Sequence, residues 1–248
     1  MFSYASNSDP VDESTCGRQA GFTLIEMSIV LAILGVILSS LMQPLGARLD
    51  AHKRADTEAL LRSVIQATKG YLSLHRKLPC PASSESAGWA LDNCAGDRAA
   101  GYVPGTTLGI PGPRDEQGLL LDSWGRRIRY VVSASDHSSR GQGSFPDFTS
   151  VGEIEDVGLR WLRSEIVVCE SGVVSTCPRQ SVRANQVPVL VYSTAENVAP
   201  TADQQENLDA DAIFVARDYS RRSGDEFDDI VVWISENEFI YEWVKSTM

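Results

Sequence analysis

One acidic side chain at the start of a long apolar stretch offers the clearest chemistry in this sequence. Glu26 is the only charged residue between Phe22 and Leu45. Thr23 lies three positions before Glu26, and this spacing matches a capping box, in which each side chain satisfies a backbone N–H at the start of a helix. A carboxylate in apolar surroundings is also unfavourable, so it should have a partner or another role. One carboxylate can serve both purposes in turn.

A second group of chemically useful residues is an acidic loop near the C-terminus. Its carboxylates are those of Asp225, Glu226, Asp228 and Asp229. Oxygen ligands on a loop are what Ca²⁺ prefers, so these residues are candidate calcium ligands. The alternative is a solvated acidic turn in which the carboxylates pair with Arg217, Arg221 or Arg222. We favour the ion-paired turn, and we expect no other metal or cofactor.

The segment Gly21-Phe22-Thr23-Leu24-Ile25-Glu26 resembles the class III signal of type IV pilins and type II secretion pseudopilins. The resemblance implies that a prepilin peptidase cuts between Gly21 and Phe22 and N-methylates the new Phe22 amine. Glycine suits such a cut because the bare backbone can approach catalytic groups closely. The resemblance also implies that the Glu26 carboxylate meets the Phe22 amine of a neighbouring subunit during filament assembly. A secretory signal peptide cut near Ala47 is the alternative, but the apolar run is too long for one.

Two later stretches resemble the pseudopilin that forms the shaft of the secretion filament. The first is Asp122-Ser123-Trp124-Gly125-x-x-Ile128-x-Tyr130, downstream of a Leu-Pro-Cys-Pro sequence. The second covers residues 223–233 and resembles a D-x-DI-x-x-W segment whose acidic loop holds calcium in that subunit. Phe227 stands where the resemblance leads us to expect a ligand aspartate.

A long N-terminal helix is expected to carry this signal. Over residues 22–45 it would reach about 36 Å, enough to cross a hydrocarbon core of about 30 Å, so we predict one membrane span. Pro44 lacks an N–H and is expected to kink the helix. Residues 46–78 continue as an amphipathic half that packs on a sheet and ends before Pro79. Its predicted apolar stripe contains Leu60, Val64, Ala67, Tyr71, Leu74 and Leu78.

Residues 79–248 predict a β-rich globular domain after a leader at 1–21 and the two helix halves. Strands are expected at 127–133, 165–169, 187–193, 212–216, 230–235 and 239–244. Tight turns are expected at Ser171-Gly172 and at Glu236-Asn237. A long helix followed by strands predicts an α+β, pilin-like fold with a mostly antiparallel sheet and disulfide-braced loops.

The cysteines favour an oxidising compartment. Of the five, Cys16 lies in the leader, and the other four form two close pairs in the sequence. Among three possible connectivities the economical one joins Cys80 to Cys94 and Cys169 to Cys177. A zinc site is not expected, because there is no C-x-x-C spacing and the chain has only three histidines. Disulfides predict a periplasmic domain on an inner-membrane, single-pass protein.

The net charge and the motifs of the chain reduce the number of functions that it could have. The net charge of −11 makes nucleic acid a poor partner, with only a local cluster of Arg126, Arg127 and Arg129 against this view. Because catalytic motifs are absent, we expect no enzyme. We expect a minor pilin or pseudopilin of a type IV pilus or type II secretion system, in a filament at the cell surface or across the periplasm. Its expected partners are prepilin peptidase, sister subunits and an inner-membrane assembly platform. The alternatives are an adhesin or substrate-binding subunit and a membrane-anchored periplasmic hydrolase.

Overall fold

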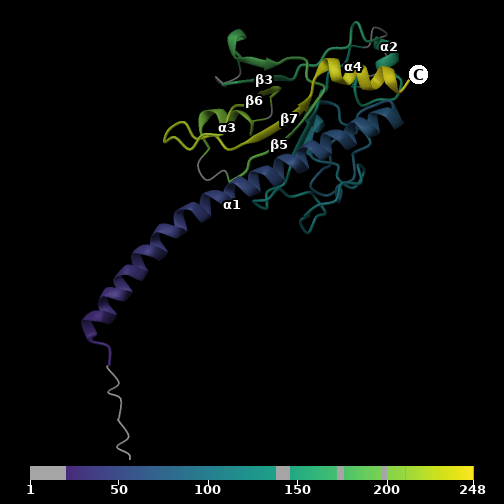
Figure 1. Cartoon of the computed structure of the whole chain (residues 1–248). Coiled ribbons are helices and arrows are strands. Elements are labelled where there is room, and N and C mark those ends of the chain that lie inside the picture. Colours follow the sequence, from purple (N-terminus) through teal and green to yellow (C-terminus); the bar gives the residue numbers. More distant parts are fainter. Residues whose placement is uncertain (1–20, 138–145, 172–175, 197–199, 210, 248) are drawn as a thin grey trace, which may run out of the picture. The chain divides into compact units, whose positions relative to one another are not determined.

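The chain forms two compact units that share one long helix. The computed structural model describes residues 21–137, 146–171, 176–196, 200–209 and 211–247, apart from the side chains of residues 40–45 and 97–98. Unit 1 ends at Arg48 and unit 2 begins at Leu49. The helix α1 (Leu24–His75) runs from the first unit into the second (Figure 1). The predicted leader lies outside the described residues except for Gly21.

Unit 2 contains two β-sheets (Figure 1). The larger sheet is antiparallel, with the strands in the order β1 (Ala100–Tyr102), β2 (Arg129–Val132), β5 (Val189–Ser193) and β7 (Ile230–Ile234). The smaller sheet has the order β4 (Val182–Ala184), β3 (Val167–Cys169) and β6 (Ile213–Val215), and β3 and β6 run parallel. The predicted α+β architecture with a mostly antiparallel sheet is confirmed.

Both faces of the larger sheet are buried. Alternate side chains of a strand point to opposite faces, and here they enter two different hydrophobic cores. One core contains residues of α1 together with Tyr130, Val132, Val189, Val191, Ile230 and Ile234. The other contains residues of the smaller sheet together with Val131, Leu190 and Tyr192. The helix and the smaller sheet therefore cover opposite faces, which explains why every residue of β5 is buried.

The second half of α1 is amphipathic, but its buried stripe differs from the prediction. The buried positions are Thr57, Leu61, Val64, Ile65, Thr68, Lys69 and Leu72. Leu74 was expected inside and is 77% exposed. The predicted stripe skipped the two threonines, although a buried threonine can satisfy its hydroxyl within a helix, as Thr68 does by donating to the Val64 carbonyl at 2.9 Å. The helix ends at His75, because Arg76 adopts a φ of 57°.

The last predicted strand is wrong, because residues 239–244 belong to a helix. This helix is α4 (Glu236–Lys245), and Glu236-Asn237 form its first turn rather than a tight turn between strands. Ser235 caps it by accepting a hydrogen bond from the Glu238 N–H at 3.3 Å. Phe239 is buried and meets Phe148 edge to face with ring centroids 5.3 Å apart. An aromatic-rich run suits a strand equally well, and the Ser235 cap is the signal that decides.

Several short elements complete unit 2. They are η1 (Gly96–Ala99), α2 (Glu153–Val157), η2 (Arg179–Ser181) and α3 (Ala202–Glu206). The strands β1 and β4 were also not predicted, because their sequences, AGY and VRA, each contain only one residue of a type that favours strands. The other five predicted strands each contain an observed one. The predicted turn at Ser171-Gly172 lies partly outside the described residues, since residues 172–175 are not described.

The first shaft-like motif has a structural role. Asp122 is buried, and its Oδ1 accepts hydrogen bonds from the N–H groups of Trp124 and Arg126, both at 2.8 Å. Its Oδ2 accepts from the Ser193 hydroxyl at 2.5 Å, which fastens this turn to β5. The Tyr130 hydroxyl donates to the Pro79 carbonyl at 2.9 Å. The motif therefore connects the sheet to the chain that leaves α1.

Candidate functional site

The predicted capping box at the start of α1 is present. The Glu26 N–H donates to Thr23 Oγ1 at 3.2 Å, and the Thr23 N–H donates to Glu26 Oε2 at 3.1 Å. The Thr23 hydroxyl also lies 3.2 Å from Glu26 Oε2. In the single chain, Glu26 thus stabilises its own helix, near the positive end of the helix dipole. Its side chain remains exposed, so a cation can reach the carboxylate.

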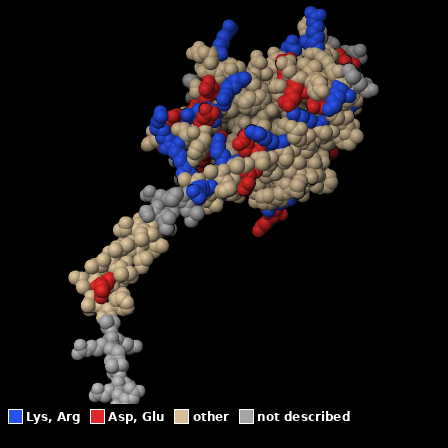
Figure 2. Space-filling model, in the orientation of Figure 1, with Lys and Arg blue, Asp and Glu red and all other residues tan. Residues whose placement is uncertain are grey.

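The apolar residues on both sides of Glu26 are exposed to an unusual extent. Phe22 is 77% exposed, Leu24 90% and Leu31 68%. Figure 2 shows this part of the chain as a surface with very little charge, whereas unit 2 displays basic and acidic side chains together. Exposed apolar area of this extent marks a surface made for lipid or for other proteins. The site is therefore one that needs partners.

The predicted membrane span, residues 22–45, lies in the first part of α1 and the two residues before it. Among the described residues, no helical segment is both long enough and apolar enough to cross a membrane. Residues 40–45 of the predicted span, including the Pro44 side chain, lie outside the described side chains. The backbone is helical on both sides of Pro44, and a kink there stays a prediction.

Both predicted disulfides are present. Cys80 is bonded to Cys94 and Cys169 to Cys177, with Cα–Cα distances of 5.6 Å and 6.0 Å. The first bridge closes the irregular segment that follows α1, and both of its cysteines are buried. The second bridge lies beside the smaller sheet, where Cys169 ends β3. Cys16 lies outside the described residues.

The acidic loop near the C-terminus is organised around an arginine. Arg217 Nε lies 2.8 Å from Asp203 Oδ2, and Arg217 Nη1 donates to Asp225 Oδ1 at 2.7 Å. Its guanidinium also lies over an aromatic ring, because its Cζ is 4.9 Å from the centroid of buried Phe227. Glu226 points elsewhere and accepts from the Gly224 N–H at 2.8 Å. The predicted pairing of this turn with Arg217 is confirmed.

Calcium is therefore not expected to stabilise this loop. Arg217 supplies the positive charge between Asp203 and Asp225, so a divalent ion would meet like charge. We expect the melting temperature of the purified chain to be the same in millimolar calcium and in chelator. Replacing Arg217 by Gln should lower the free energy of unfolding by about 2 kcal/mol or more, because two carboxylates lose their partner. Thermal melts of both chains test this, and a calcium-dependent shift of the wild type would restore the metal hypothesis.

Asp228 and Asp229 hold α3 against β7. The Asn207 amide donates to Asp229 Oδ2 at 2.8 Å, and the Gln204 amide donates to Asp228. The Asp228 carbonyl accepts from Arg54 Nη1 of α1 at 2.8 Å. Burial raises the pKa of Asp229 to about 6, although the hydrogen bonds from Asn207 and Gln204 act in the opposite direction. These two carboxylates are thus part of the packing between elements.

The raised pKa of Asp229 makes stability depend on pH. The folded chain holds this proton with a pKa of about 6 and an ordinary aspartate holds it at 3.8, so the native state binds more protons between those values. The contribution of protonated Asp229 to the free energy of unfolding is fully present below pH 3.8, and it is lost as the pH rises through about 6. We expect Asp229→Asn to raise the free energy of unfolding by about 1–3 kcal/mol at pH 7.5 and to change it little at pH 4.

Urea unfolding at the two pH values measures this effect. The exposed Asp218→Asn is the matched control, and its effect should be small at both values. An Asp229→Asn chain that is destabilised equally at pH 4 and pH 7.5 would show that the hydrogen bonds outweigh the charge.

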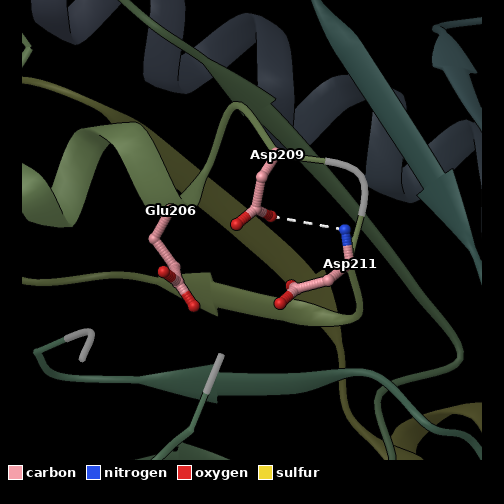
Figure 3. Close-up of side chains that lie close together, drawn as sticks. All are labelled: Glu206, Asp209 and Asp211. Atoms are coloured by element: carbon pink, nitrogen blue, oxygen red, sulfur yellow. Dashed lines mark hydrogen bonds between the residues drawn. The ribbon is translucent and has the colours of Figure 1, made fainter. Parts of the chain in front are cut away.

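A different set of acids lies close together. Glu206, Asp209 and Asp211 each place a carboxylate oxygen within 4.8 Å of the others. Figure 3 shows the three side chains gathered at the end of α3 and the loop that follows it. Asp209 also accepts a hydrogen bond from the Asp211 N–H at 3.3 Å. Among the described residues this is the group whose spacing would suit an ion, and it contains none of the four predicted calcium candidates. The E-x-x-D-x-D spacing at the end of α3 is the sequence signal that would have found it.

The arginine cluster that follows Asp122 is engaged within the fold. Arg127 Nε lies 2.6 Å from Asp115 Oδ2. Arg126 donates to the Glu196 carbonyl at 2.7 Å, and the guanidinium of Arg129 lies over the ring of Tyr102. Each of these three arginine side chains therefore contacts another part of the same fold.

Comparison with known proteins adds one positive result. The family described as the prokaryotic N-terminal methylation motif matches residues 16–42. No curated protein and no solved structure matches the chain significantly. A motif of this type implies processing by a prepilin peptidase, anchoring in the inner membrane through the N-terminal helix, and pilin-type assembly. Proteins with this signal are typically structural subunits rather than enzymes.

The matched residues include the Gly21-Phe22 pair, the capping box and the exposed apolar side chains described above. They show that the chain carries the class III prepilin signal, the N-terminal methylation motif that marks the type IV pilin and pseudopilin family.

Proposed function

We propose that this protein is a filament subunit, a minor pilin or pseudopilin of a type IV pilus or a type II secretion system. The observation that carries the proposal is the methylation motif on a helix that begins within three residues of the cleavage site. Cleavage after Gly21 would leave Phe22 as a charged N-terminus four residues before Glu26. The mature helix would then carry one cation and one anion at its apolar end.

The geometry of the capping box explains how one helix would engage another. In the single chain the Glu26 carboxylate holds the Thr23 N–H. A neighbouring helix that brings its Phe22 amine to the second carboxylate oxygen would gain a charge-assisted hydrogen bond without destroying the cap. Because an unpaired charge among apolar helices is strongly unfavourable, only one register between the helices satisfies both groups. Membrane insertion and filament assembly would thus use the same segment.

Processing is the first step that can be tested. A Cβ atom added at Gly21 meets no heavy atom within 4 Å, so a larger residue there leaves the fold intact. We expect Gly21→Val to abolish cleavage, because the branched side chain keeps the scissile backbone away from the peptidase. Mass spectrometry of the chain, expressed with and without a prepilin peptidase, measures the loss of residues 1–21 and the added methyl group.

Gly35→Val is the matched control for this experiment. Gly35 lies within α1, away from the cleavage site, and a Cβ atom there also has open space, so the variant should be cleaved normally. A wild-type chain that keeps Met1 in the presence of an active peptidase would remove the basis of the proposal.

A further inference from the structure

A groove runs along the outer side of β7, the last strand of the larger sheet. It is lined by four consecutive residues of this strand, Ile230, Val231, Val232 and Trp233. Consecutive strand residues point to opposite faces of a sheet, so a groove that touches four in a row must follow the strand's edge rather than either face. The groove has a volume of ≈ 390 Å³.

The outer edge of β7 has free backbone groups. In the larger sheet β7 is the terminal strand, and its ladder partner is β5 on the inner side. Within the described part of the chain, no backbone hydrogen bond joins residues 231–233 to anything else. Val231, Val232 and Trp233 are only half-buried. A regular, apolar edge of this kind is a template for one more strand.

The walls of the groove are more basic than the rest of this acidic protein. Its charged lining residues are Arg54, Glu58, Arg183, Arg217 and Asp229. Glu58 is paired with Arg62, and Arg217 with two aspartates. Arg183 donates to the Ala216 carbonyl at 2.7 Å, which is a neutral acceptor, so its charge is left for a ligand. A carboxylate on the added strand would find its partner there.

We propose that β7 binds an extended peptide segment of another protein as a fifth strand of the larger sheet, with an acidic side chain of that segment paired to Arg183. The two flanking layers make this binding specific. Side chains on one side of the added strand face α1, and those on the other side face the smaller sheet. The side chains of the bound peptide should therefore alternate between those that face α1 and those that face the smaller sheet. The peptide should also lack proline in its centre and carry Asp or Glu near Arg183. This activity is additional to filament assembly and does not depend on it.

The experiment selects peptides from a phage-displayed library of random 12-residue sequences on the full-length chain in detergent micelles. The most enriched peptide is then synthesised, and its Kd is measured by fluorescence anisotropy. We expect β-branched residues alternating with acidic ones. Arg183→Glu should weaken binding about tenfold or more, because a charge-assisted hydrogen bond becomes a repulsion. The matched control Arg179→Glu, on exposed η2 outside the groove, should bind as the wild type does.

Backbone methylation of the peptide distinguishes strand addition from other modes. Only alternate N–H groups of a strand point to a given neighbour, so N-methylation of one alternate set should abolish binding and methylation of the other set should not. Enrichment of no peptide, or equal tolerance of both methylated sets, would overturn the proposal. The proposal would also be overturned if the wild-type chain sediments as a dimer and the Arg183→Glu chain as a monomer, because the groove would then hold a second copy of the chain. The Glu26→Gln chain should bind the peptide normally, which separates this result from the proposed function.

Discussion

Replacing Glu26 by Gln should leave the protein processed and inserted in the membrane but almost absent from filaments. Glutamine can still accept a hydrogen bond from the Thr23 N–H, so the capping box survives while the charge is lost. The Phe22 amine of the adjacent subunit would then lack an anion among apolar helices. Removing one partner of a buried pair costs about 3–5 kcal/mol, which corresponds to a loss of incorporation of 100-fold or more. Quantitative immunoblotting of sheared filaments against the membrane fraction measures this ratio.

Two further variants separate the charge from the cap. Thr23→Val removes the hydroxyl of the capping box and keeps the carboxylate, so incorporation should stay close to the wild type. Glu26→Val removes both functions and should behave like Glu26→Gln. If Glu26→Gln enters filaments as well as the wild type, the carboxylate serves only its own helix and the assembly role is wrong.

Loss of the Cys80–Cys94 bridge should have the largest effect on the stability of unit 2. The bridge closes a loop with a sequence separation of 14 residues, and the chain-entropy model gives such a loop about 3 kcal/mol. We expect the double variant Cys80→Ala and Cys94→Ala to lose at least this amount, because both side chains are also packed in the core with Leu72 and Leu78. Urea unfolding of the purified chain, followed by far-ultraviolet circular dichroism, gives the difference.

The Cys169–Cys177 bridge supplies a matched comparison. Its sequence separation is only 8 residues, and Cys177 is not fully buried, so its removal should cost about 2.5 kcal/mol. Reducing agent should lower the free energy of unfolding of the wild type. It should not change the free energy of unfolding of a variant in which all four bridge cysteines are replaced. An equal stability of the wild type and the Cys80/Cys94 variant would mean that the first bridge does not constrain the unfolded chain.

The features that the sequence predicted correctly are local ones. The capping box depends on two residues three positions apart, and both disulfides join cysteines close in the chain. The five predicted strands that match observed ones are rich in β-branched residues, so composition was enough to locate them. The α+β class follows from the order of a long helix and then strands. The methylation motif is likewise a property of a short continuous segment.

The features that escaped prediction depend on contacts between distant parts of the chain. The pairing of Arg217 with Asp203 joins the start of α3 to the loop after β6, which no spacing rule reveals. The second core, between the two sheets, requires β3 to lie parallel to β6. The groove exists only because β7 is the final strand of its sheet. The exposed Leu74 shows the same limit, since a 4-3 spacing fits more than one stripe on a helix.

The order of strands in the larger sheet has a consequence for biogenesis. β5 pairs with β2 on one side and with β7 on the other, and β7 ends only at Ile234. Neither core can close until nearly the whole chain has been synthesised, and pairings between remote segments form slowly. The polypeptide would thus remain an open, threadable chain while its N-terminal helix is already engaged by the export machinery. For the exported subunit proposed above, this strand order would keep both cores open until β7 has been synthesised.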